Sequence, residues 1–98
     1  MNYDTLQAES GEKAIDVAIS EGPDLILMTI KLPTMTGIEA TIKLKQNPKT
    51  SSIPVIVQSD QPVHKTDAIK AGATGFLLKP TSAEDLKIAI GDVFKPKP

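Results

Sequence analysis

The sequence predicts an α/β fold in which a parallel sheet carries helices on both faces. Short apolar runs of strand length alternate along the chain with segments whose apolar residues recur at helical spacing. Glycine, proline or asparagine marks most of the junctions between them. The 98 residues fit one small domain, which we expect to span residues 1–94 and to be followed by a C-terminal tail at 95–98.

The first part of the chain shows the pattern of a strand, a helix and a second strand. A weak strand is expected at 4–8, and Ser10 is a suitable N-cap for the helix that follows. The apolar face of this helix is formed by Ala14, Ile15, Ala18 and Ile19. Gly22–Pro23 ends the helix, and the continuous apolar run at 25–28 predicts a strand that is buried on both faces.

The middle of the chain continues the alternation. A second helix is expected at about 38–46, because the asparagine and proline at 47–48 cannot extend it. The β-branched run at 54–57 predicts the next strand. A third helix should occupy about 64–71, with Gly72 closing it.

One more strand and one more helix complete the pattern. The strand is expected at 75–78, and the helix should begin near Ser82, an N-cap that places Asp85 at the third helical position. The apolar stripe of this helix is formed by Leu86, Ala89, Ile90 and Val93.

The charge composition argues against nucleic-acid binding. Eleven lysines face 12 acids, the formal net charge is −1, and no arginine is present. Arginine is the usual bidentate ligand of phosphate and guanine, and nothing here would steer a polyanion. We therefore expect Lys43, Lys45 and Lys49 to form a solvated helix face.

The chain also lacks several other kinds of site. Without cysteine it can form no disulfide, thiolate nucleophile or cysteine-based zinc site. No apolar run approaches the roughly 18 residues that a membrane span requires. We expect a cytoplasmic protein that does not bind membranes.

Four segments together make the chain resemble the response-regulator receiver domain, the CheY-like phosphoryl-accepting module of two-component signalling. They occur in the order and at the spacing of that family. They are the helix entry at 8–14, the strand and loop at 24–37, the strand at 53–59 and the strand at 71–80.

The resemblance implies a flavodoxin-like sheet from which the first strand and first helix are missing, because the chain starts where the family's second strand starts. In the family's order, 2-1-3-4-5, the missing strand would lie between the first two strands present here. The first strand could close against 25–28, or it could stay loose and leave 25–28 as an apolar edge. A second copy could also complete that edge, and we favour this homodimer slightly.

The resemblance also locates the family's phosphorylation site. The family uses an acidic pair, an acceptor aspartate, a Ser or Thr, a lysine and one Mg²⁺. Ser59, Phe76 and Lys79 stand at its switch and phosphate-contact positions, and Pro80 at its cis-proline. Thr29 stands where the family has the acceptor, and the acidic pair has no counterpart. We therefore expect no catalytic residue, no metal and no cofactor, the Mg²⁺ site being lost, and no enzyme activity.

The retained residues also have simpler structural interpretations. Lys79 is either a surface cation or a structural contact to the Thr29 loop. Ser59 is either a turn or cap residue or a surviving switch element. Phe76 is more often a packed strand residue than a moving switch. We expect the single histidine, His64, to be exposed, and Asp60 to be a cap.

The leading hypothesis is a degenerate receiver-like domain that acts through phosphorylation-independent protein–protein interaction. Its partner would bind the family's helix 4–strand 5–helix 5 face, which draws here on 64–71, Phe76 and 86–94. One alternative is a functional phosphorelay receiver that a partner chain completes, with Asp60 as the candidate acceptor. Another is an inactive fragment or engineered piece of a flavodoxin-like fold.

Overall fold

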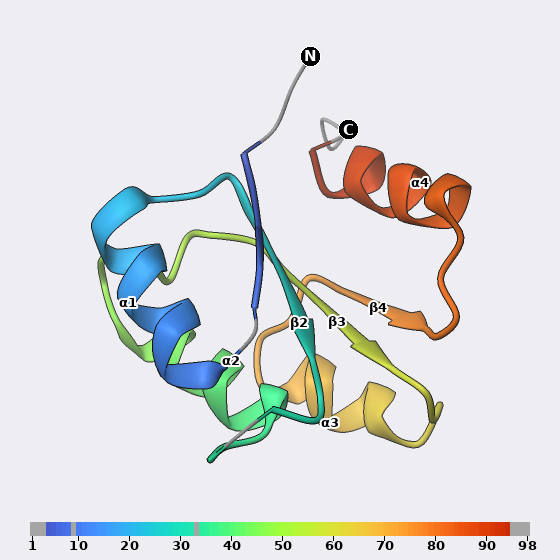
Figure 1. The fold of residues 1–98 in the computed structure, drawn as a ribbon, viewed down its shortest axis with the longest axis horizontal. Helices are drawn as coiled ribbons and strands as arrows, with labels where there is room; N and C mark the ends of the chain where they lie inside the picture. Colours follow the sequence, from blue (N-terminus) through green and yellow to red (C-terminus); the bar gives the residue numbers. More distant parts are fainter. Residues whose placement is uncertain (1–3, 9, 33, 95–98) are drawn as a thin grey trace.

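The computed structural model describes residues 4–8, 10–32 and 34–94. Within them, strands and helices alternate without exception (Figure 1). The elements are β1 (Thr5–Gln7), α1 (Gly11–Glu21), β2 (Leu25–Thr29), α2 (Gly37–Gln46), β3 (Val55–Ser59), α3 (His64–Lys70), β4 (Gly75–Leu78) and α4 (Ala83–Phe94). Every predicted element is present, with ends shifted by at most two residues. The predicted tail at 95–98 lies outside the described residues.

The four strands form one parallel sheet in the order β1-β2-β3-β4. The strands therefore all end at the same edge of the sheet, and the loops that follow them lie side by side. The predicted α/β class with a parallel sheet is confirmed. None of the described helices is long and apolar enough to cross a membrane.

The strand β2 is an interior strand, so of the three outcomes left open for 25–28 the structure shows the first, in which the first strand pairs with it, and not an open edge. β1 pairs with it in parallel, and Thr5 and Gln7 stand opposite Leu25 and Leu27. The Ala8 amide extends the pairing by donating to the Leu27 carbonyl at 3.0 Å. Because β2 is buried on both faces, its backbone groups need hydrogen-bond partners in neighbouring strands. β1 on one side and β3 on the other supply them. The homodimer expected through this edge has no site there, and the oligomeric state stays a prediction.

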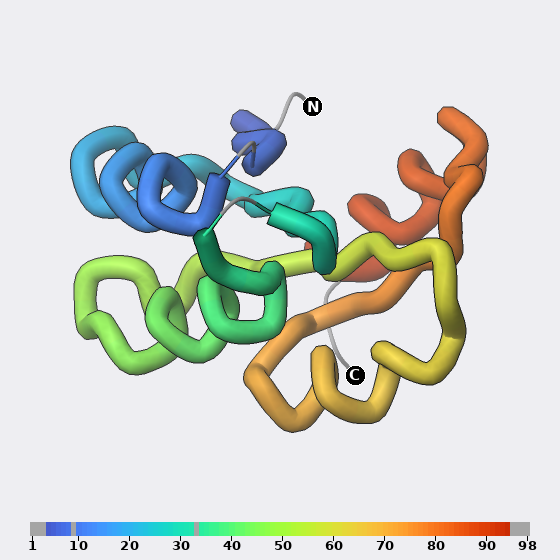
Figure 2. The backbone as a smooth tube through the Cα atoms, turned by 60° about the horizontal axis from the view of Figure 1, so that its bottom comes forward, coloured from blue at the N-terminus to red at the C-terminus, as the bar shows by residue number. Residues whose placement is uncertain are grey.

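The sheet separates two apolar layers of unequal size. One face is covered by α1, α2 and α3, whose alanines and Leu44 pack on Ile26, Met28, Val55 and Val57. The other face is covered by α4 alone, over Leu25, Leu27 and Ile56. Figure 2 shows α4 standing apart from the other three helices. The predicted stripe of α4 packs there, although no residue of this helix is fully buried.

Local sequence signals explain where the helices begin and end. The Ser10 hydroxyl accepts from the Lys13 amide at 3.2 Å, and Ser82 caps α4 through the Asp85 amide at 3.0 Å. Both caps were predicted. Gly22 follows α1 in the left-handed conformation, at φ 56°, which costs glycine little.

The lysines of α2 are not all solvated, which corrects one expectation. Lys45 is half-buried, and its Nζ donates to the Ile53 carbonyl at 2.6 Å and to the Ser51 carbonyl at 3.2 Å. Burial lowers the pKa of Lys45. This side chain therefore ties α2 to the segment before β3, whereas Lys43 and Lys49 are exposed as expected.

Candidate functional site

The candidate site lies where β2, β3 and β4 end, because all three strands point to that edge of the sheet. Thr29 is the last residue of β2, and Lys79 directly follows β4. The Lys79 Nζ donates to the Thr29 Oγ1 at 2.6 Å. Since β3 separates β2 from β4, the lysine reaches across the end of β3 to make this bond. Of the two interpretations of Lys79, the structure shows the contact to Thr29.

This hydrogen bond restrains what Thr29 can do chemically. A threonine hydroxyl becomes a nucleophile when a neighbouring base accepts its proton. A lysine ammonium has three donors and no acceptor, so it cannot play that part. The bond instead draws electron density from the Thr29 oxygen, and makes the hydroxyl a poorer nucleophile than a free one.

The start of α2 sets the position of Thr29. The Gly37 amide donates to the Ile30 carbonyl at 2.8 Å, which folds the first turn of α2 back onto the end of β2. A Cβ at Gly37 would overlap the Thr29 carbonyl oxygen and lie 2.8 Å from its carbonyl carbon. Glycine is therefore needed for this close approach. The glycine-containing loop was noted in the sequence, but this role was not predicted.

Ser59 ends β3 and is 2% exposed. Its Oγ accepts from the Gln61 amide at 3.0 Å and lies 2.6 Å from the His64 Nδ1. Ser59 is thus the turn residue that one interpretation expected. His64 is half-buried and paired, so the expectation that it is exposed is wrong. Asp60 is exposed and does not cap α3, because the N-cap is Val63 without a side-chain bond.

The remaining predicted residues surround this arrangement. Phe76 is half-buried and packs against the core beneath α1, α2 and α3. The Lys79–Pro80 peptide bond is cis, and the Lys79 amide donates to the Ser59 carbonyl at 2.7 Å. The end of β4 is therefore joined to β3 by its backbone and to β2 by its side chain.

The donor set at this edge differs from that of a divalent-cation site. Mg²⁺ binds carboxylate oxygens in proteins, but the site holds a hydroxyl, an ammonium and a serine–histidine pair. Over the ranges 4–8, 10–32 and 34–94, no group of three or more His, Cys, Asp or Glu side chains could hold a metal ion. The arrangement can form a fixed hydrogen-bond network.

Comparison with known proteins identifies the family of this chain. The family model of the response regulator receiver domain matches residues 1–91. Protein PilH of Pseudomonas aeruginosa is 37% identical over 93 residues, which cover 93% of this chain and 77% of PilH. Histidine kinase P4 of Formosa agariphila is 29% identical over 96% of this chain, which spans only 7% of that protein. The solved structure of chemotaxis protein CheY4 from Vibrio cholerae superposes with a TM-score of 0.81, at 27% identity, covering 89% of this chain and 74% of CheY4.

Proposed function

This chain belongs to the response regulator receiver domain family of two-component signalling, and we propose that it is a degenerate member that works without being phosphorylated. It would act as a protein-interaction module. The proposal includes the replacement of the family's acceptor aspartate by Thr29.

The observation that carries the proposal is the hydrogen bond between Lys79 and Thr29. In the family, the residue at the position of Thr29 takes the phosphoryl group, and the lysine contacts it. Here the lysine is already bonded to a neutral hydroxyl. A threonine oxygen forms no acyl phosphate, so the reactive bond of the family cannot arise at this position.

The family's Mg²⁺ does not suit these residues. Asp60, the acid that directly follows β3 at this edge, is exposed. A hard divalent ion needs several oxygen ligands to replace its water shell. We therefore derive no metal-dependent step for this chain.

The partner surface of the proposal is the face formed by α3, β4 and α4. Exposed apolar side chains gather on these elements and on the turn before α3. They are Val63, Ile69, Leu78 and Ile88, which are 70%, 47%, 48% and 55% exposed. Large apolar side chains in solvent at neighbouring elements favour a protein-binding surface.

Incubation with acetyl phosphate and Mg²⁺, followed by intact-mass measurement, tests the proposal. We expect no adduct of about 80 Da, the mass of one phosphoryl group. A stoichiometric adduct would overturn it. If Asp60→Asn then abolished the adduct, the alternative of a functional phosphorelay receiver with Asp60 as acceptor would take its place.

A further inference from the structure

The outer edge of β4 is open to an additional strand. β4 is the last strand of the sheet, and on its inner side the Lys79 amide donates to the Ser59 carbonyl. Backbone groups along a strand alternate between its two neighbours, so those of Phe76 and Leu78 point to the outer edge. The Thr81 hydroxyl already donates a hydrogen bond to the Leu78 carbonyl at 3.1 Å. The Phe76 amide and carbonyl and the Leu78 amide therefore remain for a fifth strand.

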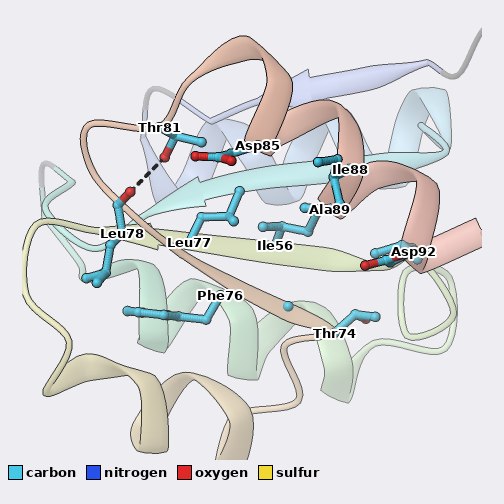
Figure 3. A pocket seen from close by; sticks show the side chains of 12 residues that line it. Ile56, Thr74, Phe76, Leu77, Leu78, Thr81, Asp85, Ile88, Ala89 and Asp92 are labelled. Carbon is cyan, nitrogen blue, oxygen red and sulfur yellow. Dashed lines mark hydrogen bonds between the residues drawn. The ribbon is translucent and has the colours of Figure 1, made fainter.

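A groove of about 690 Å³ follows this edge. Figure 3 shows that its lining comes from both faces of the sheet, because Leu77 and Ile56 lie toward α4 whereas Phe76 lies on the opposite side of β4. A ligand that contacted both sets would have to run along the strand edge. A neighbouring β-strand meets this condition, since its side chains alternate between the two faces.

The wall of the groove formed by α4 is acidic. Asp85, Ile88 and Asp92 point toward the groove from successive turns, and both aspartates are exposed (Figure 3). None of the 12 lining residues is a lysine. The groove thus combines an apolar floor with a negatively charged rim.

We propose that this groove binds an extended protein segment in which basic and apolar residues alternate, and that the segment adds to β4 as a fifth strand. This inference rests on the proposed function, and it names the chemistry of the partner and its mode of binding. The open amide and carbonyl groups supply the backbone bonds of strand addition. Because side chains alternate along a strand, the apolar ones would lie on the face of Phe76, and the basic ones would lie on the α4 face, toward Asp85 and Asp92.

A second copy of this chain is a poorer occupant of the groove. A two-fold contact between two β4 edges brings the same surface of both copies together. The carboxylates of Asp85 and Asp92 would then face their own equivalents, and like charges in contact oppose association. A basic segment removes this repulsion and replaces it with attraction.

Fluorescence anisotropy with a labelled hexapeptide, Lys-Val-Lys-Val-Lys-Val, tests the inference on the full chain. The matched control peptide replaces each lysine with glutamate. We expect the lysine peptide to bind at least about tenfold more tightly than the glutamate peptide. The double variant Asp85→Asn/Asp92→Asn should weaken lysine-peptide binding about three- to tenfold. Equal affinity for the two peptides would overturn the inference.

Two variants of Leu78 separate strand addition from side-chain contact. Leu78→Pro removes the outward amide and leaves the bonds to β3 intact, as edge strands allow. Leu78→Ala removes the same half-exposed side chain and keeps the amide. We expect the proline variant to lose at least about tenfold in affinity and the alanine variant clearly less. Equal losses would overturn strand addition, and circular dichroism checks that both variants fold.

The remaining outcomes are equally decisive. Peptide binding should slow hydrogen exchange of the Phe76 amide, and unchanged exchange would contradict a fifth strand. Light scattering without peptide tests whether a second copy of the chain occupies the groove. A dimer that the Leu78→Pro substitution dissociates would show that it does, and we expect no such dimer. The intact-mass test of the proposed function uses no peptide, so either proposal can fail while the other stands.

Discussion

Substitution of Gly37 by alanine tests the geometry that holds Thr29 in place. The added methyl group would overlap the Thr29 carbonyl oxygen and lie 2.8 Å from its carbon, so the start of α2 must move away from β2. Overpacking of this kind costs about 1–3 kcal/mol. Loss of the bond from the Gly37 amide to the Ile30 carbonyl adds about 1 kcal/mol.

The expected loss in free energy of unfolding is therefore about 2–4 kcal/mol, a large part of the stability of a domain this size. The melting temperature should fall by about 8–30 °C. Thermal and urea unfolding followed by circular dichroism measures both quantities. Displacement of β2 should also break the Lys79–Thr29 bond, which a changed chemical shift of the Lys79 Nζ protons would report.

Gly91→Ala is the matched control, because Gly91 lies within α4 and nothing stands within 4 Å of an added Cβ. Alanine is the better helix former, so this variant should gain about 0.5–1 kcal/mol. If Gly37→Ala were as stable as the unaltered protein, α2 would not press on β2 as described, and the reasoning about the Thr29 position would be refuted.

Three further predictions concern side-chain hydrogen bonds. A double-mutant cycle of Thr29→Val and Lys79→Met should give a coupling of about 0.5–1.5 kcal/mol in urea unfolding, and additive effects would mean the bond contributes nothing. Ser59→Ala should cost about 1–3 kcal/mol because it removes both hydrogen bonds of this buried hydroxyl, and a neutral result in the same assay would contradict that. The hydrogen bond from Thr34 is the main cause that lowers the pKa of Glu12 below its ordinary 4.5. The contribution of Glu12 to the free energy of unfolding is therefore present above the ordinary pKa of 4.5, and it is lost as the pH falls through the lowered pKa of the folded protein. The urea midpoint of the unaltered protein should fall more than that of Glu12→Gln between about pH 5 and pH 3, and parallel curves would refute this.

Much of the fold could be predicted because its signals are local. The apolar run of β2 and the serine caps at Ser10 and Ser82 act through neighbours in the sequence, so pattern and spacing suffice to find them. The partner of β2 could not be predicted. The apolar residues of β2 could pack beside several possible neighbouring strands, and only the packed sheet shows that β1 is the strand that pairs with it.

The candidate site was predictable in part for the same reason. The family resemblance identified Thr29, Ser59 and Lys79 as one group, and the parallel sheet brings their strand ends together. The pairing of Ser59 with His64 depends on the path of the loop between them, which residue types alone do not determine. The close approach of Gly37 to β2 is likewise a property of the packed structure.

One measurement tests the central claim most directly, namely that this receiver domain has lost its phosphoryl chemistry and the switch that depends on it. Amide spectra of the ¹⁵N-labelled protein should be recorded while Mg²⁺ and then acetyl phosphate are added. We predict no saturable shift at Thr29, Ser59 or Phe76, because we expect no carboxylate set to bind the ion and Lys79 to stay bonded to Thr29. A saturable shift at these residues that required both additions would contradict the claim and show a working phosphorylation site.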